Sequence, residues 1–139
     1  MSHTLRFDGG CQPNPGPGAG AYWIESPEGK VVEEGGVYLQ HATNNIAEYT
    51  GFIEGLLACL RHGIRRVKVE GDSMLVVCQT TGKWKASHPN IIPLCKEAMG
   101  LMKLFDSVEI KHILREYNKR ADQLSDQTIV KKVNWMSSF

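Results

Sequence analysis

The spacing of the apolar residues changes near residue 44, and this change constrains the fold more than any other feature. Before it, residues 5–8, 19–26 and 29–39 carry the short apolar or alternating runs of β-strands. From Asn44 to His62 the apolar residues instead recur at helical spacing. The sequence therefore predicts three strands in an antiparallel meander, followed by a long amphipathic helix.

The remainder of the chain predicts further strands and helices. They are a fourth strand, two helices, a fifth strand and a last helix, at residues 65–71, 72–82, 88–105, 107–114 and 118–133. Helical connections between strands favour parallel neighbours. The expected fold is therefore α/β, with a mixed sheet flanked by helices in the order βββαβααβα. Asp72 and Asn118 are expected to cap their helices, and either Thr43 or Asn44 to cap the long one.

Composition limits the classes of protein that this chain can belong to. With 139 residues it has the size of one domain, so residues 1–139 are expected to form a single unit. No apolar run is long enough to span a membrane, and no signal segment opens the chain. The net charge of +1 means that any nucleic-acid contact must come from local placement of charge. The four cysteines show no metal spacing, and Cys59, Cys78 and Cys95 are expected to be reduced helix residues in a cytoplasmic or nuclear protein.

Two acidic residues close predicted strands. Asp8 ends the first strand and Asp72 ends the fourth. Neighbouring strands lie about 4.8 Å apart, so carboxylates at adjacent strand ends can share a cation. In open α/β sheets, ligands bind beyond the carboxyl ends of the strands. The two residues form a site if their strands are neighbours. Helix capping is the plainer role for Asp72, whereas Asp8 has no capping role.

The long helix adds a third acid. Glu48 lies on the shoulder of its apolar stripe and can face the sheet, whereas Glu54, about 120° away around the helix, cannot. The same helix carries Gly51 and Gly55, each of which costs about 1 kcal/mol relative to alanine. We therefore expect its backbone to approach another element closely.

The last helix carries Asp122 and Asp126 one turn apart, and its geometry favours Asp122, which lies nearer the apolar stripe. Glu48 and Asp122 could also be first-turn acids favoured by the helix dipole. Four acids converging on one end of a sheet would repel each other unless a cation lay between them. Oxygen ligands of this kind suit Mg²⁺ or Mn²⁺ rather than Zn²⁺.

Four segments resemble the motif blocks of type 1 ribonuclease H, in the same order and at similar spacing. They are "FDGGCQPNPGPGAGAYWI", "TNNIAEYTGFIEGLLACLRHGI", "VEGDSMLVV" and "REYNKRADQLS", within residues 4–131. The resemblance implies that Asp8, Glu48, Asp72 and Asp122 are catalytic, metal-binding carboxylates. It also implies a five-stranded sheet with the second strand between the first and third. The implied activity is endonucleolytic hydrolysis of the RNA strand of RNA/DNA hybrids, by a monomer that uses Mg²⁺, for which Mn²⁺ can substitute.

The same resemblance assigns contacts with the hybrid. The residues concerned are Gly9, Asn14, Thr43, Asn44, Asn45 and Trp84. The asparagines are expected to read the 2′-hydroxyl that distinguishes RNA from DNA. Thr43, at a helix N-terminus, is expected to meet a DNA phosphate. Trp84 is expected either to stack on a DNA sugar or to be a buried structural residue.

The chemistry of phosphodiester cleavage fits several carboxylates without a single strong base. Two metal ions about 3.5–4 Å apart can activate a water and stabilise the leaving oxygen by in-line displacement. This mechanism predicts products with 5′-phosphate and 3′-hydroxyl ends.

Two features depart from the family pattern. The segment "LREYNKRAD" lacks the loop histidine of many members, and His112 lies on a predicted strand. The basic protrusion of some members is reduced to Lys83, Trp84 and Lys85.

One alternative is a related enzyme of the same superfamily, and two belong to other functional classes. An integrase-like or resolvase-like relative would lack a need for RNA-reading asparagines. A catalytically silent hybrid-binding module would not need four mutually repelling acids. A protein-interaction domain would leave the glycine- and proline-rich segment after Asp8 unexplained. Hydrolysis of hybrid is therefore the leading expectation, whether the chain is free-standing or part of a longer protein.

Overall fold

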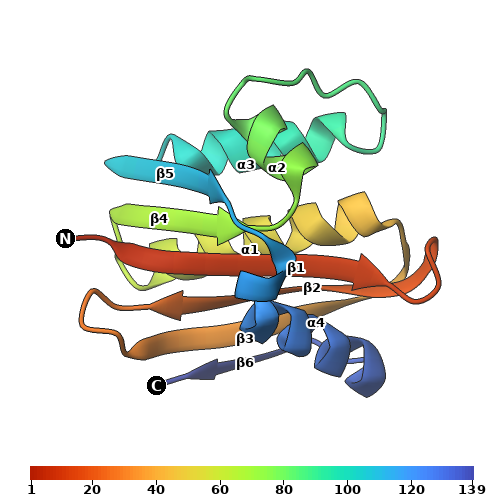
Figure 1. Cartoon of the computed structure of the whole chain (residues 1–139), viewed down its shortest axis with the longest axis horizontal. Helices are drawn as coiled ribbons and strands as arrows, with labels where there is room; N and C mark the ends of the chain where they lie inside the picture. Colours follow the sequence, from red (N-terminus) through yellow and green to blue (C-terminus); the bar gives the residue numbers. More distant parts are fainter.

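A mixed six-stranded sheet forms the centre of the computed structural model, which describes residues 1–139 (Figure 1). The strands are β1 (His3–Cys11), β2 (Gly16–Glu25), β3 (Val31–Ala42), β4 (Arg66–Gly71), β5 (Ser107–His112) and β6 (Trp135–Ser138). The helices are α1 (Asn44–Arg61), α2 (Met74–Thr80), α3 (Ile92–Met102) and α4 (Lys119–Lys131), with a 3₁₀ turn, η1, at Arg115–Tyr117. The predicted α/β class and mixed sheet are confirmed.

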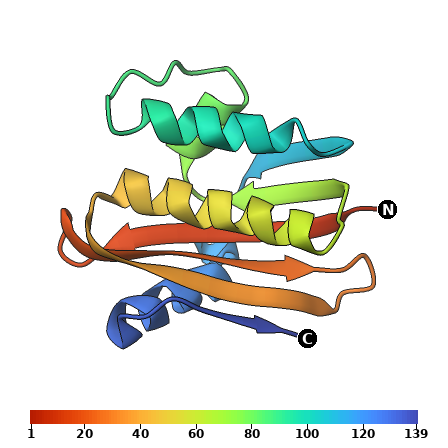
Figure 2. The same cartoon turned by 180° about the vertical axis from the view of Figure 1, so that it is seen from behind.

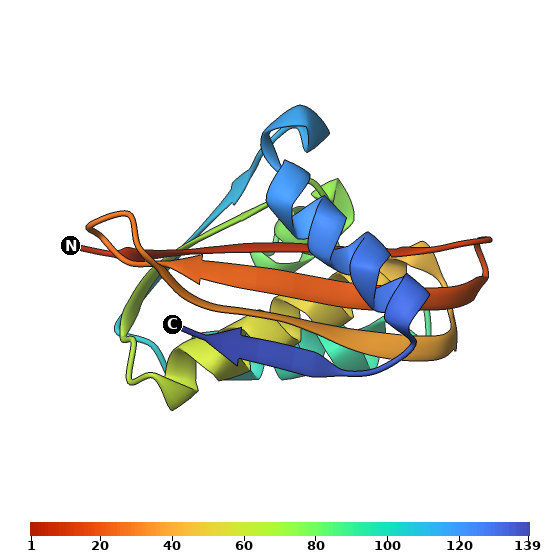
Figure 3. The ribbon, with the colours of Figure 1, turned by 90° about the horizontal axis from the view of Figure 1, so that it is seen from below.

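The helices cover the two faces of the sheet unequally. Figures 2 and 3 show α1 and α3 side by side on one face and α4 alone, crossing the strands, on the other. Thr43 caps α1, because its side-chain oxygen accepts a hydrogen bond from the amide of Ile46. No helix is both long and apolar enough to cross a membrane.

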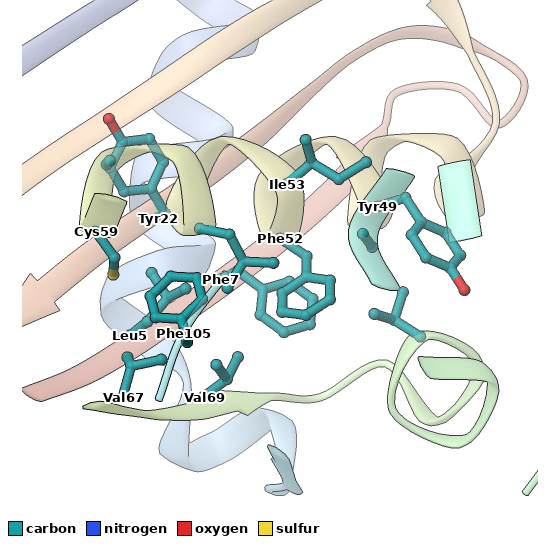
Figure 4. Packing of buried hydrophobic residues seen from close by; sticks show 14 of the residues in the cluster. Leu5, Phe7, Tyr22, Tyr49, Phe52, Ile53, Cys59, Val67, Val69 and Phe105 are labelled. Carbon is teal, nitrogen blue, oxygen red and sulfur yellow. The ribbon is translucent and has the colours of Figure 1, made fainter. Parts of the chain in front are cut away.

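The main core lies between the sheet and α1. It is built where the inward residues of β1 and β4 meet the apolar stripe of α1, as Figure 4 shows. Phe7 and Phe52 are fully buried there, with ring centroids 5.1 Å apart. Burying a side chain of this kind stabilises the fold by about 1.5–3 kcal/mol. This packing fixes the position of α1 over β1.

The strand order, β5-β4-β1-β2-β3-β6, makes β1 and β4 parallel neighbours. It also places β2 between β1 and β3, as predicted. The parallel pairing of β1 with β4 ends at Phe7 and Gly71. Asp8 and Asp72 are therefore each the first residue beyond that pairing.

The sixth strand was not predicted. β6 pairs antiparallel with β3, and the Trp135 indole donates a 2.8 Å hydrogen bond to the Thr128 hydroxyl on α4. A side chain on Gly36 would crowd that indole, its Cβ lying 2.8 Å from the indole nitrogen. The short segment has little apolar pattern of its own, so its strand conformation depends on the free edge that β3 offers.

One strand boundary and two helix-cap predictions were wrong. β1 continues through Asp8 to Cys11, so the glycine-rich stretch is mostly strand and only residues 12–15 form the connecting loop. Ser73 caps α2 in place of Asp72, because its hydroxyl accepts a hydrogen bond from the Val76 amide. Asn118 makes no side-chain cap, because its amide turns into the sheet.

All four cysteines are free, and Cys59, Cys78 and Cys95 lie buried on α1, α2 and α3, as expected for reduced helix residues. The helix expected over residues 88–105 is shorter, because the regular turns of α3 begin only at Ile92, just before Pro93.

A buried polar cluster lies where α1 ends. The Glu33 carboxylate on β3 is fully buried and accepts two hydrogen bonds from the Arg61 guanidinium, at 3.1 and 2.9 Å. It also contacts the Tyr22 hydroxyl, the Nε2 atom of His62 at 2.8 Å and the Ser138 hydroxyl at 3.3 Å. This cluster joins α1 and the edge strand β6 to β3.

Candidate active site

Three carboxylates meet beyond the parallel pairing of β1 with β4. Asp8, Glu48 and Asp72 each offer an oxygen within 4.8 Å of the others. They come from β1, α1 and the residue after β4, so three elements far apart in sequence build the cluster. The structure thus brings together three of the four acids predicted from sequence.

Glu48 reaches this position because α1 lies directly on β1. A Cβ atom on Gly9 would overlap the backbone carbonyl of Ala47, and one on Gly51 would overlap the carbonyl oxygen of Asp8. One on Gly55 would lie 2.6 Å from the Leu5 side chain. The close approach expected from the helix glycines is confirmed. Gly9, predicted as a substrate contact, also serves this packing.

Burial and mutual repulsion raise the pKa of each of these acids. Burial, then the charge of Asp72, raises the pKa of Asp8 to about 8. Burial, then the charges of Asp8 and Asp72, raises the pKa of Glu48 to about 10. Burial also raises the pKa of Asp72. A concentration of negative charge that the protein itself does not neutralise is what a cation site requires.

The donor set fits a hard divalent cation. The Glu48 Oε2 atom is buried and has no hydrogen-bond partner in the protein. An orphaned buried carboxylate oxygen is costly unless something else binds it. All the nearby ligand atoms are carboxylate oxygens, which Mg²⁺ and Mn²⁺ prefer.

Asp122 lies in the first turn of α4, at the edge of this cluster. It lines a cleft of about 330 Å³ together with the three clustered acids and with Asp126. The charge of Asp122 is among the main causes that raise the pKa of both Asp8 and Asp72, after the effect of burial, and the charge of Asp126 is not. Asp122 is therefore the more closely coupled of the two to the cluster, in agreement with the helix geometry.

Of the predicted asparagines, Asn44 lines the cleft and Asn14 is hydrogen-bonded to it. The Asn44 side-chain oxygen accepts a 2.9 Å hydrogen bond from the Cys11 amide. The Asn14 side-chain oxygen accepts a 3.1 Å hydrogen bond from the Asn44 amide. These bonds occupy both side-chain oxygens, so each NH₂ group remains a donor for other partners.

Thr43 and Asn45 lie on the other side of the α1 N-terminus. They line a separate pocket of about 220 Å³, together with Ser87 and His88 from the loop before α3. Trp84 is on the loop between α2 and α3 with 48% of its surface exposed, so it is not a buried structural residue. It lines neither this pocket nor the cleft.

Two residues of the cleft region were missed from sequence. Arg115, in η1, lines the cleft and lies 3.7 Å from the Asp122 carboxylate. Asn118, expected only as a cap, is buried and donates a 2.9 Å hydrogen bond to the carbonyl of Phe7, next to Asp8. Both belong to the block "REYNKRAD", where a cluster of polar residues just before a helix was the available signal.

Comparisons with known proteins agree with this geometry. A family model described as reverse transcriptase-like matches residues 6–128. The crystal structure of RNase H1 from the halophilic archaeon Halobacterium salinarum matches with a TM-score of 0.89 and 35% identity, covering 96% of this chain and 100% of that one. This chain belongs to the type 1 ribonuclease H family.

Other members of the family extend the comparison. LC11-RNase H1, solved in complex with an RNA/DNA hybrid, matches this ribonuclease H-type chain with a TM-score of 0.88 and 30% identity, covering 94% of it and 99% of the LC11 chain. A ribonuclease HI of Halobacterium salinarum is 38% identical over 123 residues, which is 88% of this chain but 62% of the relative. The chain thus spans less than two thirds of that relative.

Proposed function

We propose that this protein hydrolyses the RNA strand of RNA/DNA hybrids in a reaction that depends on divalent cations. The observation that carries the proposal is the cluster of Asp8, Glu48 and Asp72, with a buried carboxylate oxygen that no protein group satisfies. Family membership and the LC11 complex support hybrid as the substrate.

The role of the carboxylates is to bind the metal ions. Asp8, Glu48, Asp72 and Asp122 would hold two Mg²⁺ ions, or Mn²⁺ in their place. When bound, such ions supply the positive charge that activates a water and stabilises a leaving oxygen. The expected products carry 5′-phosphate and 3′-hydroxyl ends. Asn118 steadies the end of the β1 pairing beside Asp8 through its bond to the Phe7 carbonyl.

Strand discrimination follows from the fixed amides. Because the oxygens of Asn14 and Asn44 accept backbone hydrogen bonds, their NH₂ groups are the atoms that remain for substrate. An NH₂ donor can bind the oxygen of a 2′-hydroxyl or an acceptor in the minor groove. Asn44 lines the cleft beside the carboxylates and Asn14 is bonded to it, so we expect the RNA strand to be the one that reaches the metal site.

The pocket lined by Thr43 and Asn45 suits the DNA strand. It lies at the N-terminus of the 18-residue helix α1, where unpaired amides attract anions, so a phosphate can bind there. Trp84, exposed on a neighbouring loop, offers a stacking or packing surface for a deoxyribose.

The test is single-turnover cleavage of three duplexes of one sequence: hybrid, DNA duplex and RNA duplex. We expect cutting of only the RNA strand of the hybrid, in Mg²⁺ or Mn²⁺ and not in EDTA. End-labelling of the products should show a 5′-phosphate and a 3′-hydroxyl. The Asp8→Asn variant is the control for a contaminating nuclease. Equal cutting of the DNA duplex would contradict the proposal and favour a transposase-like activity.

A further inference from the structure

A second hollow lies on the same face of the sheet as Asp8. Side chains alternate along a strand, so Arg6 on β1 projects from the same face as Asp8, away from the core under α1. Arg6, Glu70 on β4 and Lys111 on β5 line a hollow of about 510 Å³. The helix on this face, α4, packs on β1, β2 and β3 and leaves β4 and β5 uncovered, as Figure 1 shows.

The turn η1 separates this hollow from the cleft. Its first residue, Arg115, lines the cleft, and its last, Tyr117, lines the hollow. The next residue, the buried Asn118, ties the turn to β1 through its hydrogen bond to the Phe7 carbonyl. A strand that leaves the cleft over η1 therefore reaches the hollow directly.

The charges in the hollow differ from those in the cleft. Arg6 donates a 2.9 Å hydrogen bond to Glu70 and lies 3.7 Å from Glu25, so its charge is balanced within the sheet. Lys111 is exposed and lies next to Glu70 in register, but it forms no ion pair. The hollow thus offers one cation that can bind a phosphate, whereas five acids and one arginine line the cleft.

Two exposed apolar side chains border the hollow. Tyr117 has 70% of its surface exposed and Leu114 has 57%, and neither belongs to the core. An exposed apolar residue by itself is ordinary. An exposed aromatic ring beside an unpaired lysine is the combination with which proteins bind single-stranded nucleic acid, because a base stacks on the ring and a phosphate meets the cation. Tyr117 and Lys111 line one hollow and meet this condition.

The position of the hollow favours the RNA strand. We expect RNA at the carboxylates, and DNA at the pocket of Thr43 and Asn45 on the other side of the α1 N-terminus. The hollow adjoins the carboxylates across η1, so it lies on the RNA side. Bases inside the hybrid cannot stack on a side chain, because neighbouring base pairs cover both of their faces. An unpaired nucleotide beyond the end of the hybrid can do so.

We propose that the hollow binds an unpaired nucleotide of the RNA strand, where that strand continues beyond the hybrid. The base stacks on the Tyr117 ring beside Leu114, and Lys111 contacts a phosphate. The site rests on the proposed hydrolysis of hybrid and adds to it a preference for RNA that carries a single-stranded tail. The RNA passes the cleft in one direction, so a tail at one end, 5′ or 3′, is favoured and a tail at the other is not.

The experiment compares a short blunt hybrid with hybrids whose RNA carries an unpaired tail at the 5′ or the 3′ end. In wild type, one of the two tails should lower the KM for cleavage by about fivefold or more, the effect of one stacked base. The value of kcat should not change, because the tail binds equally in the ground state and the transition state. A tail on the DNA strand at the same end should leave KM unchanged.

Substitutions assign the gain to the hollow. Tyr117→Ala should remove it and leave cleavage of the blunt hybrid unchanged, whereas Tyr117→Phe should keep it, because stacking uses the ring. Lys111→Ala should lose part of the gain and make the remainder less sensitive to salt. Phe139→Ala is the matched control, since Phe139 is also an exposed aromatic residue, at 76%, but follows β6 at the opposite edge of the sheet. This control should keep the whole gain.

A photoreactive base tests the contact itself. In the Asp8→Asn background, which is expected to bind hybrid without cutting it, 5-iodouridine in the favoured tail should crosslink to Tyr117. Peptide mass spectrometry locates the crosslinked residue. The crosslink should disappear when Tyr117→Ala is added to this background.

Three outcomes would overturn the site: equal KM values for blunt and tailed hybrids, a gain that survives Tyr117→Ala, and a tail that crosslinks elsewhere but not to Tyr117. An equal gain from a DNA tail would overturn the assignment to the RNA strand. If wild-type protein leaves hybrid uncut, the proposed function itself fails. If hybrid is cut and neither RNA tail changes KM, only this site fails.

Discussion

Two glutamates near opposite ends of α1, Glu33 on β3 and Glu48 on the helix itself, have opposite surroundings. The carboxylate of Glu33 is contacted by four side chains, and the guanidinium of Arg61 makes two of these hydrogen bonds. Burial tends to raise its pKa, but hydrogen bonds from Arg61, Tyr22 and His62 outweigh burial and lower the pKa to about 2. Glu48 has an oxygen with no partner, and burial beside two aspartates raises its pKa to about 10.

The difference distinguishes an acid that stabilises the fold from one that is suited to bind a ligand. Glu33 is ionised, paired and distant from the cleft, so its charge stabilises the native state. For Glu48, burial and the neighbouring aspartates outweigh the one backbone hydrogen bond, from Gly9, that favours its ionised form, so its position weakens the fold in the absence of a cation. A carboxylate with a buried oxygen that no protein group satisfies therefore identifies a functional site more reliably than burial or acidity alone.

The largest expected effect lies in the cluster of Asp8, Glu48 and Asp72, which has no positively charged partner in the protein. Asp8→Asn and Asp72→Asn should each lower the rate of hybrid cleavage by about a thousandfold or more, since a bound metal supplies several kcal/mol to the transition state. Calorimetry in EDTA should show that neither variant unfolds at a lower temperature, because each relieves repulsion within the cluster. Near wild-type cleavage by Asp72→Asn would contradict the metal-site assignment.

Substitutions on α4 test which aspartate, Asp122 or Asp126, is the fourth acid of the site. Asp122→Asn should lower the cleavage rate by about a hundredfold, because its carboxylate lies near Asp8 and Asp72. Asp126→Asn, one turn away, should change it by less than about threefold. The measurement is single-turnover cleavage at saturating Mg²⁺. The reverse ranking would move the fourth ligand by one helical turn.

Substitutions in the cluster around Glu33 should lower stability and leave activity unchanged. Glu33→Gln removes the charge that holds Arg61 and His62 to β3. We expect a loss of about 2 kcal/mol in the free energy of unfolding, below the 3–5 kcal/mol of a fully buried pair because Arg61 is half exposed. Urea titration gives the loss. Cleavage at a temperature where the variant is folded should match wild type.

The two glutamates should also give opposite pH dependences of stability without metal. The depressed pKa of Glu33 contributes stability above its ordinary value of 4.5, and this is lost as pH falls towards 2. The raised pKa of Glu48 makes the folded state retain a proton that the unfolded state releases, so stability falls as pH rises from 4.5 towards 10.

Unfolding temperatures in EDTA between pH 2 and pH 9 test this contrast. Glu48→Gln should flatten the alkaline side of the curve and Glu33→Gln the acid side. Adding Mg²⁺ to wild type should also flatten the alkaline side, because a cation replaces the retained proton. An alkaline side that is equally steep in Glu48→Gln would assign the repulsion to other groups.

Sequence predicted the parts of this molecule that depend on local pattern. The strands, the amphipathic α1 and the close approach at Gly51 follow from periodicity and from the cost of glycine in a helix. The convergence of Asp8 with Asp72 followed from parallel strand ends. The particular choice of these acids as ligands came from the resemblance of the motif blocks.

The parts that sequence did not predict depend on partners distant in the chain. β6 is a strand only because β3 has a free edge, and nothing in residues 135–138 indicates it alone. Glu33 is buried because α1 ends above it, and an acidic pair in a strand gives no sign of this. Arg115 could not be placed from pattern, because its position is fixed through the buried Asn118.

The direct backbone contact between α1 and β1 also decides how the protein tolerates sequence change. Replacing a helix glycine by alanine usually stabilises a protein, and at the exposed Gly100 on α3, where a Cβ would meet nothing within 4 Å, that gain is open. At Gly51 the same methyl group would strike the Asp8 carbonyl and push Glu48 away from its partners. Thermostabilising libraries should therefore accept alanine at Gly100 and reject it at Gly51. Natural substitutions are likewise expected at Gly100 and not at Gly51.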